Sequence, residues 1–186
     1  MAAVCRVPLR RMARPCYYHC MKVAIFFGSK SDTDSMKKAA DVLRDFGVDY
    51  KAYIISAHRA GALLDKTVRA VEADGCEVII AGAGLAAALP GVIAGKTVLP
   101  VIGVPLECVS PGRSSGLSGM DALLSIVQMP PQIPVATVGI GNARNAAYLA
   151  VEILALKYPE LHKRLVDFRT KLAADAEASG GMGVEL

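Results

Sequence analysis

The sequence places one histidine where proton-transfer chemistry is expected. His58 lies in Ser56-Ala57-His58-Arg59, directly after the apolar pair Ile54-Ile55. The other two histidines, His19 and His162, lie in an Arg-rich N-terminal stretch and in a charged C-terminal stretch that predicts a solvated helix. Open α/β folds hold ligands at the carboxyl ends of strands, where an imidazole can exchange protons and a guanidinium can hold an anion. The pattern predicts proton transfer on an anionic substrate; alternatively, His58 is a surface residue and Arg59 a helix-flanking charge.

A second candidate group follows an earlier apolar run. Gly28-Ser29-Lys30-Ser31-Asp32 is a small-residue turn before a segment of helical spacing. Such a turn presents backbone N–H groups and the positive end of the helix dipole to an anion. Ser29 would donate to a phosphate and Asp32 would accept from ribose hydroxyls, unless Ser31 or Asp32 only caps the helix. The turn matches neither the Walker A nor the dinucleotide pattern, and it favours a mononucleotide or a sugar phosphate.

A third group is rich in glycine and alanine. It follows the apolar run at residues 78–81 and reads Gly82-Ala83-Gly84-Leu85-Ala86-Ala87-Ala88-Leu89-Pro90-Gly91. Its glycines would let the backbone approach a ligand closely, although helix–sheet packing alone could also require them. Each of the three groups is a weak signal alone, and their convergence on one edge of a sheet predicts a binding site.

These groups have to be positioned by alternating strands and helices. Apolar runs predict strands at residues 23–27, 50–55, 78–81, 98–104 and 135–140. Helical spacing predicts helices at residues 34–46, 61–73, 92–95, 121–128, 142–156 and 159–174, with a loop over 107–119. Strands rich in Val and Ile that alternate with helices are typical of a parallel sheet covered on both faces. The sequence therefore predicts a doubly wound, three-layer α/β/α sandwich with a five-stranded parallel sheet.

Composition limits the partners of such a domain. The chain has 186 residues, 53% of them hydrophobic, and a mean hydropathy of +0.39. No apolar run approaches the roughly 18–20 residues that a membrane span needs, so we expect no membrane contact and instead a homo-oligomer that buries the apolar surplus. We expect no nucleic-acid partner, because the net charge of +4 is concentrated in residues 1–20 and leaves the remainder close to neutral.

The cysteines and the N-terminus bear on location and domain organisation. Cys76 and Cys108 are isolated and lack metal-ligand spacing, so we expect no metal and a reduced cytoplasmic location. Residues 1–20 are Arg-rich and contain no acidic residue. They predict a leader that is disordered or that precedes the true start at Met21, with residues 21–186 forming one catalytic domain.

Several motifs occur in the order found in one known family. They are Gly28-Ser29-Lys30-Ser31-Asp32, Ser56-Ala57-His58-Arg59, Ile79-Ile80-Ala81-Gly82-Ala83-Gly84, Leu89-Pro90-Gly91, Pro100-Val101-Ile102-Gly103-Val104-Pro105, Leu117-Ser118-Gly119-Met120-Asp121, Leu124-Ser125-Ile126-Val127-Gln128-Met129-Pro130 and Pro134-Val135-Ala136-Thr137. From about Lys22 to Tyr158 the chain resembles the N5-carboxyaminoimidazole ribonucleotide mutases, also called catalytic subunits of phosphoribosylaminoimidazole carboxylase.

The resemblance implies a step of de novo purine biosynthesis in which a carboxylate moves from the exocyclic amine of an imidazole ribonucleotide to ring carbon C4, through CO2 and without a cofactor. It implies a flavodoxin-like subunit in a cytoplasmic homo-octamer with active sites at subunit junctions. His58 would be the general acid/base. The substrate-binding residues would be Ser29, Asp32, Arg59, Ser56, Gly82, Ala83, Gly84, Ala88 and Leu89, with the backbone of 83–88 walling a CO2 pocket.

The sequence departs from the family pattern and leaves alternatives open. Ala88 stands where the mutases carry a second histidine, Leu85 stands where they carry a glycine, and the segment 107–116 is longer than their usual link. Related enzymes that carboxylate aminoimidazole ribonucleotide directly typically have Lys where this chain has Arg59. Direct carboxylation, a catalytically impaired paralogue and a nucleotide- or flavin-binding module of flavodoxin type remain the alternatives.

Overall fold

A parallel sheet forms the middle layer of the protein. The computed structural model describes residues 22–110, 113–114 and 117–180, so the leader predicted at residues 1–20 lies outside it. The strand order is β2-β1-β3-β4-β7, and every neighbouring pair is parallel. The strands are β1 (Val23–Phe27), β2 (Tyr50–Ile54), β3 (Val78–Gly84), β4 (Val101–Leu106) and β7 (Ala136–Thr137). The predicted five-stranded parallel sheet is confirmed.

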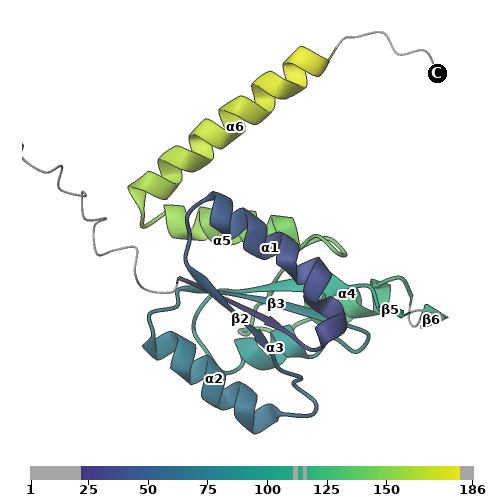
Figure 1. The fold of residues 1–186 in the computed structure, drawn as a ribbon. Coiled ribbons are helices and arrows are strands. Elements are labelled where there is room, and N and C mark those ends of the chain that lie inside the picture. The colour runs from purple at the N-terminus through teal and green to yellow at the C-terminus, as the bar shows by residue number, and fades with distance from the viewer. Residues whose placement is uncertain (1–21, 111–112, 115–116, 181–186) are drawn as a thin grey trace, which may run out of the picture.

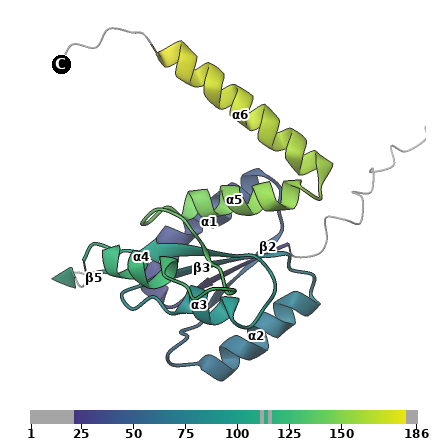
Figure 2. The same ribbon diagram turned by 180° about the vertical axis from the view of Figure 1, so that it is seen from behind.

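Helices cover both faces of this sheet (Figures 1 and 2). One face packs against α1 (Thr33–Asp45), which follows the short 3-10 helix η2 (Lys30–Asp32), and against α5 (Ala143–Ala155). The other face packs against α2 (Gly61–Ala73), α3 (Leu89–Ala94) and α4 (Met120–Val127). In β1, Ile25 joins the first core and Phe26 joins the second, so a central strand has to be apolar at every position. The predicted three-layer α/β/α sandwich is confirmed.

Helix α6 (Pro159–Ser179) leaves the sandwich. Its first half packs against α5, where Leu161 and Leu165 are buried. From Lys171 to Ser179 every residue is exposed, and Figures 1 and 2 show this end projecting away from the three layers. The helix therefore has a packed half and a free half.

The boundaries of several elements differ from those predicted. Strand β7 has two residues rather than the six of 135–140, because only Ile102 and Gly103 of β4 pair with it. Strand β3 extends three residues further, to Gly84, because Ala83 and Gly84 pair with β4. Strand β4 begins at Val101 rather than at 98, after a turn in which the Thr97 hydroxyl accepts the N–H of Leu99. Pairing between strands and turn chemistry, rather than local hydropathy, decide these boundaries.

Three helical or loop segments also differ. Helix α3 begins at Leu89 rather than at 92, with Pro90 in its first turn, where a missing N–H is tolerated. Helix α6 continues to Ser179 instead of ending at 174. Within the loop predicted at 107–119, β5 (Val109–Ser110) pairs antiparallel with β6 (Arg113–Ser114). In the part of the chain that the structure describes, no helix combines the length and the apolar composition needed to cross a membrane.

Candidate functional site

A cavity of about 280 Å³ opens at the carboxyl edge of the sheet. It is formed by the segments that follow β1, β2 and β3, with one residue from the end of β4. Since β1 lies between β2 and β3, this is the point where the chain changes direction along the sheet, which is where doubly wound folds bind ligands. The lining residues are Gly28, Ser29, Ser31, Asp32, Ser56, Ala57, His58, Arg59, Ala83, Gly84, Leu85, Ala86, Ala87, Ala88, Leu89 and Cys108.

Most of the predicted site residues lie together in this cavity. His58, Arg59, Ser56, Ser29, Asp32, Ala83, Gly84, Ala88 and Leu89 all line it. Gly82 does not. It is buried inside β3, and a Cβ at this position would lie 2.4 Å from the sulfur of Met36. The expectation for Gly82 assumed that the strand ends at Ala81; because the strand continues to Gly84, Gly82 lies below the cavity and admits Met36 instead.

The turn after β1 fixes Ser29 and Asp32 against each other. The Ser29 hydroxyl accepts the backbone N–H of Ser31, and an Asp32 carboxylate oxygen accepts the backbone N–H of Ser29 at 3.1 Å. This reciprocal pair is a capping box for η2. Capping and ligand binding are therefore compatible at this turn, because both side chains also line the cavity.

The Asp32 carboxyl is half-buried, and this changes its acidity. Burial raises its pKa, and hydrogen bonds from the Ser31 hydroxyl and the Ser29 backbone N–H partly offset the effect. The pKa is raised on balance, and these two donors limit the rise by stabilising the carboxylate form, which can accept hydrogen bonds from hydroxyl groups of a ligand.

His58 and Arg59 lie on a tight turn after β2. The N–H groups of Arg59 and Ala60 both donate to the Ser56 carbonyl oxygen, at 3.3 and 2.9 Å, and hold the turn at the cavity rim. Both side chains are exposed. Within the described residues neither forms a side-chain hydrogen bond or an ion pair, so the imidazole and the guanidinium are available to a ligand.

The loop after β3 forms the third wall. Leu85 has a φ of +55°, in the left-handed region that favours glycine. The N–H of Ala87 donates to the Leu85 carbonyl at 2.8 Å, which tightens the loop before α3. Ala88 then forms the N-cap of α3 with no capping side chain. The wall is made of methyl and methylene groups together with backbone, which suits a ligand part of low polarity.

Cys108 lines the cavity, although the sequence analysis assigned it no role. A Cβ on Gly84 would lie 2.8 Å from its sulfur, so the glycine lets the thiol approach the loop backbone. Burial raises the pKa of this thiol, and the carboxylates of Asp32 and Asp121 raise it further. The thiol is therefore neutral near pH 7 and adds a weakly polar surface. Cys108 follows the end of β4, so the rule that identified the other groups would also have found it.

Comparisons with known proteins find relatives that match most of the chain. The family model described as AIR carboxylase matches residues 22–175. A Pyrococcus abyssi protein named N5-carboxyaminoimidazole ribonucleotide mutase is 57% identical over 148 residues, which cover 80% of this chain and 82% of that protein. The Escherichia coli protein of the same name is 49% identical over 150 residues, covering 80% of this chain and 85% of that protein.

A solved structure extends the similarity to the fold. The crystal structure of Treponema denticola PurE matches with a TM-score of 0.71 and 28% sequence identity, over 86% of this chain and 98% of that chain. The matched residues of the family model include all three turns that build the cavity.

Proposed function

Since the chain belongs to the AIR carboxylase family, we propose that it is a mutase of purine biosynthesis that converts N5-carboxyaminoimidazole ribonucleotide to 4-carboxy-5-aminoimidazole ribonucleotide. The observation that carries the proposal is the single cavity in which His58 and Arg59 meet Ser29, Asp32 and an apolar wall. The reaction needs these four functions: a proton carrier, an anion anchor, a ribose contact and a compartment for CO2.

The chemistry can be written with one imidazole. The bond between the exocyclic nitrogen and the carboxylate carbon breaks, which releases CO2, and the amine takes a proton. Ring carbon C4 then attacks the retained CO2, a C–C bond forms, and the C4 proton leaves. His58 donates the first proton and accepts the second, so it ends the cycle in its starting form.

The other residues hold the substrate and the CO2. Arg59 and Ser29 anchor the phosphate, and Asp32 accepts hydrogen bonds from the ribose. Ser56 adds a hydroxyl at the rim. Ala83, Gly84, Ala88 and Leu89 wall the CO2 pocket, and the buried Gly82 supports this wall from below. Fixed positions keep CO2 and C4 in register, which supplies a large part of the rate enhancement in such reactions.

The assembly is part of the proposal. Helix α4 has only two buried residues, while Met120, Leu124 and Val127 are 45–51% exposed on one side of it and Leu117 just before it is 70% exposed. Such an apolar surface is typical of a subunit contact. It supports a homo-octamer in which neighbouring subunits border the active site. We place the octamer in the cytoplasm, with residues 21–186 as its single catalytic domain.

A two-substrate assay tests the function. One sample receives the N5-carboxylated ribonucleotide without added bicarbonate, and the other receives aminoimidazole ribonucleotide with excess bicarbonate. The mutase converts the first substrate faster at equal enzyme concentration. Preference for the second substrate would make the protein a direct carboxylase, a lyase, and turnover of neither would indicate a catalytically impaired paralogue.

A further inference from the structure

Leu85 has a backbone conformation that a leucine rarely adopts. Its φ of +55° lies in the left-handed region, where the Cβ of an L-residue crowds the following carbonyl oxygen and raises the free energy of the fold. Ser118 and Gln132 are the other non-glycine residues with a positive φ in the described part of the chain, and neither lines the cavity at the sheet edge. Strained residues persist where another demand outweighs the strain, and they cluster at functional sites. The leucine at position 85 therefore needs a reason beyond the turn that it forms.

Core packing does not supply that reason. The Leu85 side chain is 43% exposed and belongs to neither of the two hydrophobic cores. Its backbone carbonyl oxygen accepts the N–H of Ala87 at 2.8 Å, and a glycine at position 85 would accept the same hydrogen bond without strain. The leucine side chain instead lines the cavity. The benefit of a leucine at this position therefore has to be sought in the cavity.

The other side chains of this loop are small or buried. Ala87 and Leu89 are buried in the core that covers the second face of the sheet. Between residues 83 and 89 only Leu85 and Ala86 are exposed. Because the Ala86 side chain is a single methyl group, Leu85 is the one residue of the loop with enough exposed apolar bulk to cover the mouth of the cavity.

The two departures of this loop from the family pattern compensate each other in bulk. Ala88 stands where the mutases carry a histidine, and Leu85 stands where they carry a glycine. Both positions line the cavity. The loop therefore lacks a large side chain at one point of the wall and has gained one at another.

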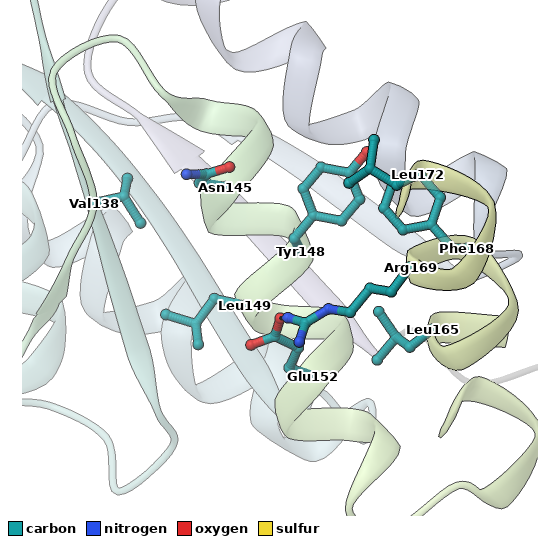
Figure 3. A pocket seen from close by; sticks show the side chains of 9 residues that line it. All are labelled: Val138, Asn145, Tyr148, Leu149, Glu152, Leu165, Phe168, Arg169 and Leu172. Carbon is teal, nitrogen blue, oxygen red and sulfur yellow. Dashed lines mark hydrogen bonds and ion pairs between the residues drawn. The ribbon is translucent and has the colours of Figure 1, made fainter. Parts of the chain in front are cut away.

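A larger cavity elsewhere in the molecule does not offer the same chemistry. It has a volume of about 580 Å³ and lies between α5 and α6 (Figure 3). The Arg169 guanidinium is paired there with the Glu152 carboxylate, and no histidine is among the described residues that line it. The cavity at the sheet edge combines the apolar loop with His58, which suits CO2 held beside a proton carrier.

We propose that Leu85 is a specificity-determining residue of the mutase reaction: its side chain covers the mouth of the CO2 pocket and directs CO2 to C4 rather than to solvent. The inference rests on the proposed function. Free CO2 carries no charge, so the charged groups at the rim hold it poorly, and an apolar side chain retains it by occupying its way out. The same side chain keeps water away from the reacting atoms, which suppresses side reactions.

Two outcomes compete once the bond between the exocyclic nitrogen and the carboxylate carbon breaks. In both, the electron pair of that bond stays on nitrogen, nitrogen takes a proton from His58, and CO2 is released. In the productive outcome C4 attacks CO2, a C–C bond forms, and the C4 proton passes to His58. In the unproductive outcome CO2 escapes and reacts with water to give bicarbonate and a proton, aminoimidazole ribonucleotide is left, and His58 regains a proton from solvent. Leu85 acts only on the choice between these outcomes.

Three replacements separate side-chain bulk from backbone strain. Leu85→Gly removes the side chain and relieves the strain, Leu85→Ala removes most of the side chain and keeps the strain, and Leu85→Met keeps the bulk. The substrate is the N5-carboxylated ribonucleotide with an isotopic label in its carboxylate, in unlabelled bicarbonate buffer, and spontaneous loss of CO2 without enzyme is subtracted. We expect the ratio of aminoimidazole ribonucleotide to C4-carboxylated product to rise about tenfold in Leu85→Gly and Leu85→Ala, the scale on which small changes of an apolar pocket alter discrimination. Leu85→Met should stay near the wild-type ratio.

The isotope gives a second readout. The wild type and Leu85→Met should retain the label in the C4 carboxylate, whereas Leu85→Gly and Leu85→Ala should exchange part of it for unlabelled CO2. Val98→Ala shortens a fully exposed side chain before β4 and is the control, which should match the wild type.

Three results would overturn the inference while leaving the proposed reaction in place. They are the wild-type ratio with retained label in both Leu85→Gly and Leu85→Ala, a rise in Leu85→Met as large as in Leu85→Ala, and a lower native mass at the wild-type ratio, which would assign Leu85 to a subunit contact. A wild type that forms no C4-carboxylated product overturns the proposed function itself, and this inference with it.

Discussion

The proposed mechanism requires His58 both to donate and to accept a proton, and its surroundings leave both directions open. The imidazole lies at the rim of the cavity and forms no hydrogen bond within the described residues. Ala88 adds only a methyl group to the facing wall, and no second imidazole lines the cavity. His58 is therefore the single group of its kind among the lining residues.

Replacing His58 by Asn should separate catalysis from binding. We expect turnover to fall by about 10²–10⁴-fold, the usual contribution of a general acid/base. Binding of the ribonucleotide, measured by calorimetry, should change little because Arg59, Ser29 and Asp32 still hold it. His162→Asn on the exposed side of α6 is the control and should keep wild-type turnover. Wild-type turnover in His58→Asn would contradict the assigned role.

Leu85 has a strained backbone, so its replacement by Gly should stabilise the protein. The φ of +55° costs a branched residue about 1–2 kcal/mol. Part of the gain is offset, because Gly raises the conformational entropy of the unfolded chain and so lowers the free energy of unfolding by about 0.5–1 kcal/mol. We expect the free energy of unfolding to rise by up to about 1 kcal/mol in urea denaturation. Gly84→Ala should act in the opposite direction, since its Cβ would lie 3.0 Å from the Leu106 carbonyl oxygen. A drop in stability for Leu85→Gly would refute the strain argument.

The sequence could identify the residues at the rim of the cavity but not those beneath it. Ser56, His58 and Arg59 follow a strand whose end the hydropathy marks clearly, so their place at the edge was predictable. Gly82 lies inside a strand rather than after it, because β3 continues past the predicted end at 81 through its pairing with β4. Pairing between strands that are distant in the sequence decides where such a strand ends. A local sequence pattern does not reveal this pairing.

At the scale of elements, a hydrogen-bonded cluster of four residues (the clamp) lies at the bend between α5 and α6. The Glu77 carboxylate accepts hydrogen bonds from the ammonium groups of Lys22 and Lys157, at 2.8 and 3.0 Å, and from the Tyr158 hydroxyl. Both ammonium groups also lie 5.4 Å from the centre of the Tyr158 ring. The clamp joins the beginnings of β1 and β3 to the residues directly before α6, so it helps to fix the direction of α6.

Stability should depend on the ionisation of Glu77. Burial alone would raise its pKa, but the hydrogen bonds from Lys22, Tyr158 and Lys157 outweigh burial and hold the pKa below the ordinary value of 4.5. A lowered pKa means that the contribution is fully present above about pH 4.5 and is lost as pH falls through the folded-state value. Urea denaturation at a series of pH values should show this loss on the acid side.

Replacing Glu77 tests whether the clamp causes this pH dependence. Glu77→Gln should lower the free energy of unfolding at pH 7 by about 1.5–3 kcal/mol, the usual range for hydrogen bonds to charged groups. It should also flatten the acid limb of the pH profile. Asp41→Asn breaks the exposed pair with Arg44 and should cost less than about 1 kcal/mol. Equal losses in the two variants would show that the clamp contributes no more than an ordinary surface pair.

The sequence predicted the bounds of β1 and β2 more closely than those of β3, β4 and β7. Residues 23–27 form β1 as predicted because both faces of the strand are buried and every side chain is apolar. Residues 135–140 include Thr137 and Gly139 and yield only the short β7, because only Ile102 and Gly103 of β4 pair with it. How far a strand extends depends on which of its residues pair with a neighbouring strand, and a single sequence does not reveal that pairing.

At the scale of the whole molecule, the exposed side of α4 and the free half of α6 are both uncovered by other described residues, and they lie in different places. The exposed side of α4 adjoins the active-site edge, because Gly119 at its start lies beside Glu107 at the end of β4. The free half of α6 projects away from the sandwich (Figure 1). The homo-octamer proposed above would need more than one kind of contact between identical subunits, and the exposed side of α4 is one candidate for such a contact.

Substitutions on the two surfaces should have different effects on turnover. Leu124→Asp puts a charge on the exposed side of α4, so we expect a lower native mass together with at least a tenfold loss of turnover, because a neighbouring subunit would no longer border the cavity. Leu172→Asp, on the free half of α6, should have a smaller effect on turnover, because this end of the helix projects away from the sandwich that holds the cavity. Val98→Asp, at a fully exposed residue before β4, should change neither. Full turnover by dissociated Leu124→Asp subunits would show that each cavity is complete within one chain, and the role of neighbouring subunits in the site would then have to be abandoned.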